Sequence, residues 1–416
     1  MLIRFRAENI RSIKTEQELS LVASALTEHE ETLVHAPQYD LNLLRSAGIY
    51  GPNASGKSSV VEAIAFMQAA VVYSHVGWKP TDGVPLTTFA LDPVYAEAPS
   101  MFAADLLLDG VRYEYGFVAD ASRIREEWLY AWPRGRRQEW FTRDVDQDDE
   151  YVFSRLLSGE NRAIRALTRP NSLFLSAAAQ NNHEMLSPVH RWFADQLLVA
   201  GDRMRGTLAA RVGDRCRDAA YRDSVFELLK AADLGISGLQ LVDDDAVSLL
   251  SKAADAMFNV FGDGNVGNLR LLHRAGAGPD VALAFSDESA GTRTLFTLAG
   301  TIVEALASGG TLVVDELDRS LHPHLSTQIV RTFNDPAANP RNAQLIFNTH
   351  DTNLLDAGIL RRDQVWFTEK GDDGATHLFP LTDFRARKSE NLERGYLQGR
   401  YGAVPSVGTP VRGTGA

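Results

Sequence analysis

The chain has 416 residues, of which 44% are hydrophobic and 23% charged, an ordinary balance for a globular protein of two or three domains or of one large core with an insertion. Its net charge of −12 argues against a wide, permanently basic nucleic-acid face. Cys216 is the only cysteine, which excludes an intrachain disulfide and a cysteine-rich metal site and fits a reduced, cytoplasmic setting.

Residues 1–50 are expected to open a mixed sheet. Apolar and charged side chains alternate over residues 1–6, which predicts a strand rather than a secretory signal. A second strand is expected at 19–22. The run Asn9-Ile10-Arg11-Ser12-Ile13 lies between the two strands, where a plain hairpin connection is the simplest interpretation.

The phosphate-binding pattern G-x-x-x-x-G-K-[ST] lies between an expected strand at 46–50 and an expected helix at 59–67. Glycines let the backbone curl around an anion, and the inward-pointing amides form an anion nest. Lys57 then reaches the β- and γ-phosphates of a nucleotide, and Ser58 offers its hydroxyl to Mg²⁺. The residues that we assign to this loop are Gly51, Pro52, Asn53, Ala54, Ser55, Gly56, Lys57, Ser58 and Ser59.

Residues 84–155 carry short β signals. Apolar runs at 101–108 and 111–118 flank Asp109-Gly110, a strong hairpin signal. Further strands are expected at 124–130 and 138–142, which together predict an antiparallel sheet beside the nucleotide site.

From about residue 184 to residue 274 the pattern becomes helical. Apolar side chains recur at steps of three and four residues, at positions Leu197, Leu198, Met204, Leu208, Val225, Leu228 and Leu229. The segment is too short for a long rod-like coiled coil, so a short helical insertion is expected.

Residues 281–381 return to alternating helices and strands. The runs 311–314 and 345–347 are continuously apolar, as expected for parallel strands that are buried on both faces. Asp315 and Glu316 follow the first run: Asp315 can hold Mg²⁺, and Glu316 can orient and deprotonate a water for attack on the γ-phosphate. His350 follows the second run, where a histidine can hydrogen-bond the γ-phosphate.

A serine–glycine run, Glu288-Ser289-Ala290-Gly291-Thr292-Arg293, precedes a helix expected from about residue 294. Ser289 or Thr292 is expected to cap that helix, whose exposed amides suit an anion. An ordinary capped helix is the alternative. The apolar stretch at 295–314 is interrupted by Glu304 and by two glycines, so a helix followed by a strand is expected and not a membrane span.

Other patterns leave alternatives open. His322 and His324 could form a metal pair, but further ligands at suitable spacing are missing. The run 369–372 is similar to a guanine-selecting motif but lacks its asparagine and is expected to form a β-turn. Two arginine groups could form a phosphate-binding stripe for DNA or RNA, or could pair with carboxylates: Arg155, Arg162, Arg165 and Arg169, and Arg203, Arg205, Arg211, Arg215 and Arg217.

Taken in order, a phosphate loop, a serine–glycine run before a helix, Asp-Glu at a strand end and a histidine after the next strand resemble the ABC-type ATPase head. The chain is more closely similar to the compact RecF/Rad50/OLD-like branch, the AAA15-type "AAA family ATPase" proteins that are often found in prokaryotic defence loci. The segments that match this group's pattern are 9–12, 288–293, 315–318 with 321–323, and 396–402.

This resemblance implies an α/β fold, an ABC-type P-loop NTPase head with a parallel core, an antiparallel β subdomain and a short helical insertion. The expected divisions are an N-terminal lobe at 1–183, the insertion at 184–274, a C-terminal lobe at 275–405 and a disordered tail at 406–416.

The resemblance also implies a homodimer in which two heads hold two ATP molecules between them. Ser289 and Gly291 of one subunit would contact the γ-phosphate of the ATP that Lys57 of the other subunit holds. Further residues that the resemblance assigns to the site are Arg11 and Ser12 beside the phosphates, Asp318 at the dimer seam and Gln180 as the metal-sensing glutamine.

The sequence therefore predicts an enzyme that binds ATP and Mg²⁺, hydrolyses ATP and gates a nucleic-acid or protein effector, in anti-phage defence or DNA maintenance. The alternative is an ATP-dependent scaffold or sensor that sequesters a co-encoded toxin with little hydrolysis. A small-molecule P-loop kinase would leave the Ser289–Gly291 run without a role.

Overall fold

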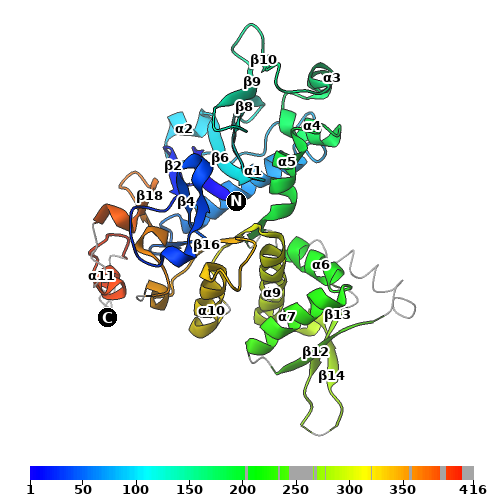
Figure 1. The fold of residues 1–416 in the computed structure, drawn as a ribbon, viewed down its shortest axis with the longest axis vertical. Coiled ribbons are helices and arrows are strands. Elements are labelled where there is room, and N and C mark those ends of the chain that lie inside the picture. The colour runs from blue at the N-terminus through cyan, green and yellow to red at the C-terminus, as the bar shows by residue number, and fades with distance from the viewer. Residues whose placement is uncertain are drawn as a thin grey trace, which may run out of the picture.

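The structure is a computed structural model and describes residues 1–201, 205–232, 235–242, 266, 269–276, 278–319, 321–355, 358–384 and 390–404. The predicted disordered tail at 406–416, Met204 and Arg203 lie outside these residues. Figure 1 shows an elongated α/β molecule. The antiparallel sheet lies toward one end of its long axis and a small three-stranded sheet lies at the other.

A six-stranded sheet positions the nucleotide site. Its first five strands are parallel and the last pairs in the antiparallel sense. The central strands are buried along their whole length, because their apolar runs pack on both faces of the sheet. In spatial order the strands are β11 (Leu197–Ala200), β15 (Thr311–Val314), β16 (Gln344–Asn348), β5 (Ser46–Tyr50), β17 (Val365–Lys370) and β18 (Thr376–Pro380).

A seven-stranded antiparallel sheet confirms the β pattern predicted for residues 84–155. Its central hairpin turns at Asp109 and Gly110, whose φ angles of 49° and 76° match a tight primed turn. In spatial order its strands are β10 (Tyr151–Phe153), β9 (Gln138–Asp144), β8 (Ile124–Trp132), β7 (Val111–Ala119), β6 (Ser100–Leu108), β1 (Leu2–Glu8) and β2 (Gln17–Ser20). A two-stranded hairpin, β3 (Val34–Ala36) and β4 (Leu41–Leu43), follows β2.

Helices cover both faces of the parallel sheet. Helix α1 (Lys57–Tyr73) lies in the core between the two large sheets, where the ring of Phe66 lies 4.8 Å from that of Phe102 on β6. The other face packs against α9 (Ala290–Ser308), α10 (Pro323–Asn334) and α11 (Leu392–Leu397). Shorter helices are α2 (Pro93–Glu97), α3 (Asn161–Leu167), α4 (Phe174–Gln180) and α5 (Ser187–Arg191).

The segment 184–274, expected to be helical, is of mixed structure. Helices α6 (Arg205–Arg215) and α7 (Ala219–Ala231) agree with the expectation, but Leu197–Ala200 forms the edge strand β11 of the parallel sheet. The helical prediction was wrong there, because a run of four apolar residues has no period that separates a strand from a helix. The segment also supplies β12 (Ile236–Leu241) and β13 (Leu269–His273), which pair with β14 (Val281–Ala284).

Helices α6 and α7 pack on α9. The Glu304 side chain of α9 is only 4% exposed and forms ion pairs with Arg211 and Arg215 of α6. A Cβ at Gly300 of α9 would lie 2.3 Å from the Val212 side chain, so the helices approach closely at this glycine. The small sheet and the start of α9 are therefore parts of one packed unit, apart from the main core.

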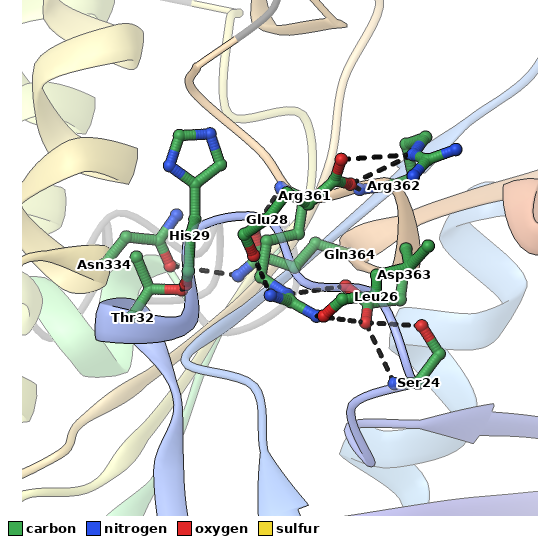
Figure 2. A network of polar contacts seen from close by, with 10 residues as sticks. All are labelled: Ser24, Leu26, Glu28, His29, Thr32, Asn334, Arg361, Arg362, Asp363 and Gln364. Atoms are coloured by element: carbon green, nitrogen blue, oxygen red, sulfur yellow. Dashed lines mark hydrogen bonds and ion pairs between the residues drawn. The ribbon is translucent and has the colours of Figure 1, made fainter. Parts of the chain in front are cut away.

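A polar cluster lies at the start of β17, at the opposite end of the parallel sheet from the phosphate loop that follows β5. Figure 2 shows its contacts. Arg361 is 1% exposed and pairs with Asp363 at 2.8 Å, just before β17 begins. Ser24 Oγ donates to the same aspartate at 2.8 Å, and Arg362 pairs with Glu28 at 3.1 Å. These contacts join an N-terminal loop to a C-terminal strand and so hold the sheet that carries the site.

Candidate functional site

The phosphate loop joins β5 to α1, as the sequence predicts. Gly56, directly before α1, has a φ of 106°, and a Cβ there would lie 2.0 Å from Thr376 Oγ1. A larger residue is excluded at this position, because the backbone is left-handed and β18 packs against it. The loop is therefore a fixed cradle whose helix begins at Lys57.

Lys57 points back into this cradle. Its Nζ donates to the carbonyl oxygens of Gly51 at 2.8 Å and Pro52 at 3.1 Å. Burial lowers the pKa of Lys57, while the carboxylates of Asp318, Glu316 and Asp315 oppose that shift. The ammonium group is thus held where phosphate oxygens of a nucleotide would replace the two carbonyls.

Carboxylates gather at the carboxyl ends of β15 and β16, beside the loop. Ser58 Oγ donates to Asp315 Oδ1 at 3.0 Å, and the same oxygen accepts from Asn348 Nδ2 at 2.5 Å. Glu316 has a φ of 57° and pairs with Arg319 at 3.3 Å. The parallel register of the strands brings these groups from distant parts of the sequence to one edge.

The Asp318 carboxylate is tied to the histidine loop. Thr349 Oγ1 donates to it at 2.8 Å, and the His350 backbone N–H donates to both of its oxygens at 3.2 and 3.3 Å. Partial burial, and then the charge of Lys57, lower the pKa of His350. The imidazole is therefore neutral at pH 7 and can donate one N–H to a phosphate oxygen.

Hydroxyl groups close the other side of the loop. Ser12 Oγ lies 2.8 Å from Ser59 Oγ and 2.7 Å from Thr376 Oγ1, and Thr376 in turn donates to the Ser55 carbonyl at 3.0 Å. Arg11 pairs with Glu62 of α1 at 2.9 Å. Ser12 thus touches the phosphate loop directly, whereas Arg11 braces the helix behind it.

Ser289 and Gly291 stand at the start of α9. Ser289 caps the helix by accepting the Thr292 backbone N–H at 3.1 Å, as the sequence predicts, although the helix begins at Ala290 and not near Thr294. Ser289 is exposed. In the described part of the chain, no hydrogen bond links it to Lys57 or Asp315 of the same subunit.

Gln180 differs from its expected setting. It was expected to follow a strand, but it is the exposed last residue of helix α4, whose first amides are capped by the buried Glu127 carboxylate. The run of small and apolar residues before it resembles a strand in sequence, and the Glu127 cap that favours a helix comes from distant β8. Its role as a metal-sensing residue stays a prediction.

Two groups near the site were not singled out from the sequence. Asn348 contacts Asp315 and Glu316, and Thr368 Oγ1 lies 2.6 Å from Ser55 Oγ under the loop. Asn348 directly follows a buried apolar run, the same signal that identified Asp315, and could have been found in that way. Thr368 gives no such signal, because its contact depends on the pairing of β17 with β5.

The donors present fit Mg²⁺ held in the manner of a P-loop protein. In the described residues no group of three or more His, Cys, Asp or Glu side chains could hold a metal ion. His322 instead caps α10 by accepting the His324 backbone N–H at 3.3 Å. A P-loop site needs only the Ser58 hydroxyl and the Asp315 carboxylate, because phosphate oxygens and waters complete the shell.

A family model described as "AAA domain, putative AbiEii toxin, Type IV TA system" matches residues 46–356, three quarters of the chain and all of the site from the phosphate loop to His350. The chain belongs to this AAA domain family. Its ATPase-type site is thus supported by family as well as by geometry. No curated protein matches the sequence.

Two solved structures that resemble this AAA domain protein are heads of SMC proteins. The SMC head domain from Thermotoga maritima shares 13% identity at a TM-score of 0.37, with 91% of this chain and 98% of that chain covered. The SMC head bound to the C-winged helix domain of ScpA shares 12% identity at a TM-score of 0.43, with 92% of this chain and 99% of that chain covered.

Several described arginines of the two groups in this AAA domain protein are engaged within the chain. Arg165 pairs with Asp149 at 3.1 Å, and Arg169 donates to two backbone carbonyls. Arg211 and Arg215 pair with Glu304, as described above.

In the part of the chain that the structure describes, no helix has both the length and the apolar character that crossing a bilayer requires.

Proposed function

We propose that this chain is an AAA15-type ATPase of the ABC head kind that hydrolyses ATP to ADP and phosphate as a dimerising switch. One observation carries the proposal. Lys57, Ser58, Asp315, Glu316 and His350 come from three separate parts of the sequence and meet at one edge of the parallel sheet. Each has the chemistry that phosphoryl transfer to water requires.

The residues have separate tasks in this mechanism. Lys57 leaves the Gly51 and Pro52 carbonyls and donates to the β- and γ-phosphates. Ser58 and Asp315 would hold Mg²⁺, which neutralises charge on the phosphates when bound. Glu316 orients a water and accepts its proton, and neutral His350 donates an N–H to the γ-phosphate.

The dimer follows from the exposed start of α9. Ser289 and Gly291 would contact the γ-phosphate that Lys57 of the partner subunit holds, because a helix N-terminus presents amide donors to anions. Hydrolysis removes the γ-phosphate and with it these contacts, so the heads separate. Asp318, fixed by the histidine loop, would lie at the seam between the subunits.

The dimer would gate an effector in anti-phage defence or DNA maintenance, in a cytoplasmic setting. Among the described residues, the engagement of Arg165, Arg169, Arg211 and Arg215 within the chain favours a protein effector over DNA or RNA. A second function has its own support, since the family description names a toxin of a toxin–antitoxin system. ATP would then hold an oligomer that sequesters or displays a toxic activity with little hydrolysis.

A Glu316→Gln variant tests the switch. It should bind ATP like the natural protein, hydrolyse it at least about 100-fold more slowly and accumulate as a dimer, because the general base is lost and the γ-phosphate stays in place. ATP turnover and sedimentation with and without ATP measure these effects. Undiminished turnover would exclude Glu316 as the base, and normal turnover without any dimer would exclude the sandwich.

A Ser289→Arg change in the Glu316→Gln background tests the interface. A bulky cation at the exposed helix start should prevent the ATP-dependent dimer while each subunit still binds ATP. Exposed Ser286→Arg, in the turn just before, is the matched control and should dimerise. A dimer that forms equally well with Ser289→Arg contradicts the assigned contact.

A further inference from the structure

Asn348, the last residue of β16, has no exposed surface, and its side chain and backbone both contact the carboxylate loop after β15. Its Oδ1 accepts the Glu316 backbone N–H at 2.5 Å, and its Nδ2 donates to Asp315 Oδ1 at 2.5 Å. Its backbone carbonyl accepts the Leu317 N–H at 3.0 Å. One residue therefore holds three consecutive positions of the loop.

The chemistry of its partners fixes the orientation of this amide. A backbone N–H can only donate, so the side-chain oxygen must face Glu316. The NH₂ group is then turned to Asp315, whose carboxylate can only accept when ionised. A reversed amide would oppose donor to donor and acceptor to acceptor, so the observed arrangement is the one that satisfies both contacts.

The turn that Asn348 holds is conformationally costly. Glu316 has a φ of 57°, in the left-handed region that costs a non-glycine residue about 1–3 kcal/mol. Such a conformation persists where its surroundings over-determine it, and here the two amide contacts to Glu316 and Leu317 do so. The turn directs the Asp315 side chain to Ser58 and the Glu316 side chain to Arg319.

We propose that Asn348 is a positioning residue for ATP hydrolysis, which aims the Glu316 base and orients Asp315 toward the metal position beside Ser58. This inference rests on the proposed ATPase function. Asn348 contacts Glu316 and Asp315 and would act through their two carboxylates. Asn348 stands two residues before His350. The same segment would therefore contact the γ-phosphate through His350 and position Glu316 and Asp315 through Asn348.

Steady-state kinetics of Asn348→Ala and of the similarly sized Asn348→Leu test the role. Loss of an outer contact of this kind lowers activity by about 10- to 100-fold, so we expect that fall in kcat with a KM for ATP within about threefold of the natural value. Fluorescent ATP-analogue binding and the thermal midpoint report whether the site remains folded.

Asn339→Ala is the matched control. Asn339 is equally buried and makes three hydrogen bonds, to Phe333 and Ala343, near the other end of β16. Its loss should lower the thermal midpoint and leave kcat of the folded protein unchanged. A merely structural role for Asn348 predicts the same behaviour for both asparagines.

The Asn348→Asp variant adds a measurement, the pH dependence of kcat, that a purely structural role would not change. The introduced carboxylate can still accept from Glu316 but repels Asp315, and once protonated it can donate to Asp315 again. Its kcat relative to the natural protein should therefore rise as the pH falls from about 8 to 5.5, because a carboxyl beside a like charge has a raised pKa.

The outcomes separate the two proposals. If the natural protein binds and hydrolyses no ATP, the proposed function fails and this inference fails with it. If it hydrolyses ATP but Asn348→Ala stays within about threefold in kcat, only the inference is overturned. Loss of folding in both Asn348→Ala and Asn348→Leu, or a pH-independent activity ratio for Asn348→Asp, also overturns it.

Discussion

His183 shows how a single buried residue makes the molecule sensitive to pH. Its Nδ1 accepts the Leu186 backbone N–H at 3.3 Å, so Nε2 carries the proton and lies 3.0 Å from Asn161 Oδ1. The residue is 4% exposed, and burial lowers its pKa below the usual 6.5. Protonation would place a second donor against the Leu186 N–H.

Stability should therefore fall on acidification. Between the lowered folded-state pKa and 6.5 the unfolded chain binds more protons, so the free energy of unfolding decreases as the pH drops through that range. Urea unfolding at pH 7.5, 6.5 and 5.5 measures it. A His183→Gln variant should lose less stability over this range than the natural protein, and an equal loss would contradict the assignment.

Among single residues, those of the phosphate loop and the carboxylates after β15 could be located from the sequence. Their spacing is dictated by the anion and the metal that they would bind. Asn348 gave the same signal as Asp315, a polar residue directly after a buried apolar run, but Thr376 was harder to predict. Thr376 reaches the loop only because β18 pairs with β17. Gln180 was assigned from the family resemblance, on the expectation that it follows a strand, but the segment before it is helix α4.

Among the elements, α9 joins the candidate interface to the α6–α7 unit. Gly291 of the candidate interface lies in its first turn. Gly300 and Glu304, further along the helix, contact Val212 and Arg211 of α6. Just before it, Glu288 lies 2.7 Å from the His273 ring of β13. The small sheet therefore contacts the residue that lies two positions before α9, while α6 and α7 contact the middle of that helix.

A Gly300→Ala change should loosen this unit. The added Cβ would meet Val212 at 2.3 Å and the Tyr221 hydroxyl at 2.9 Å, and overpacking of this kind costs about 1–3 kcal/mol. Hydrogen exchange should show faster opening of α6 and α7 with little change in α1. Gly276→Ala, where a Cβ would meet nothing within 4 Å, is the control; unchanged exchange in α6 and α7 would contradict the close packing.

Helices and antiparallel strands with a clear periodicity could be predicted from the sequence, as the strands at 101–118 and helix α7 show. The edge strand β11 did not, because four apolar residues look alike in a helix and in a strand. Its place beside β15 is decided by tertiary pairing, which local pattern does not contain.

For the whole molecule, a dimer closed by nucleotide makes stability depend on concentration. The thermal midpoint of Glu316→Gln with ATP and Mg²⁺ should rise when the protein concentration is raised tenfold, because association favours the folded state by mass action. The nucleotide-free protein should show no such rise. A midpoint that responds to ATP but not to protein concentration would favour a monomer that binds ATP alone.

The order of strands in the parallel sheet has a consequence for synthesis on the ribosome. Strand β5 carries the phosphate loop but lies between β16 and β17, which are made about 300 residues later. The phosphate loop and helix α1 therefore gain their contacts with Ser12 and β6 from early residues, but the loop gains its neighbours in the parallel sheet only after β16 and β17 have been made. A nascent chain would therefore complete the sheet around the loop, and with it the carboxylates after β15, only once these late strands have emerged.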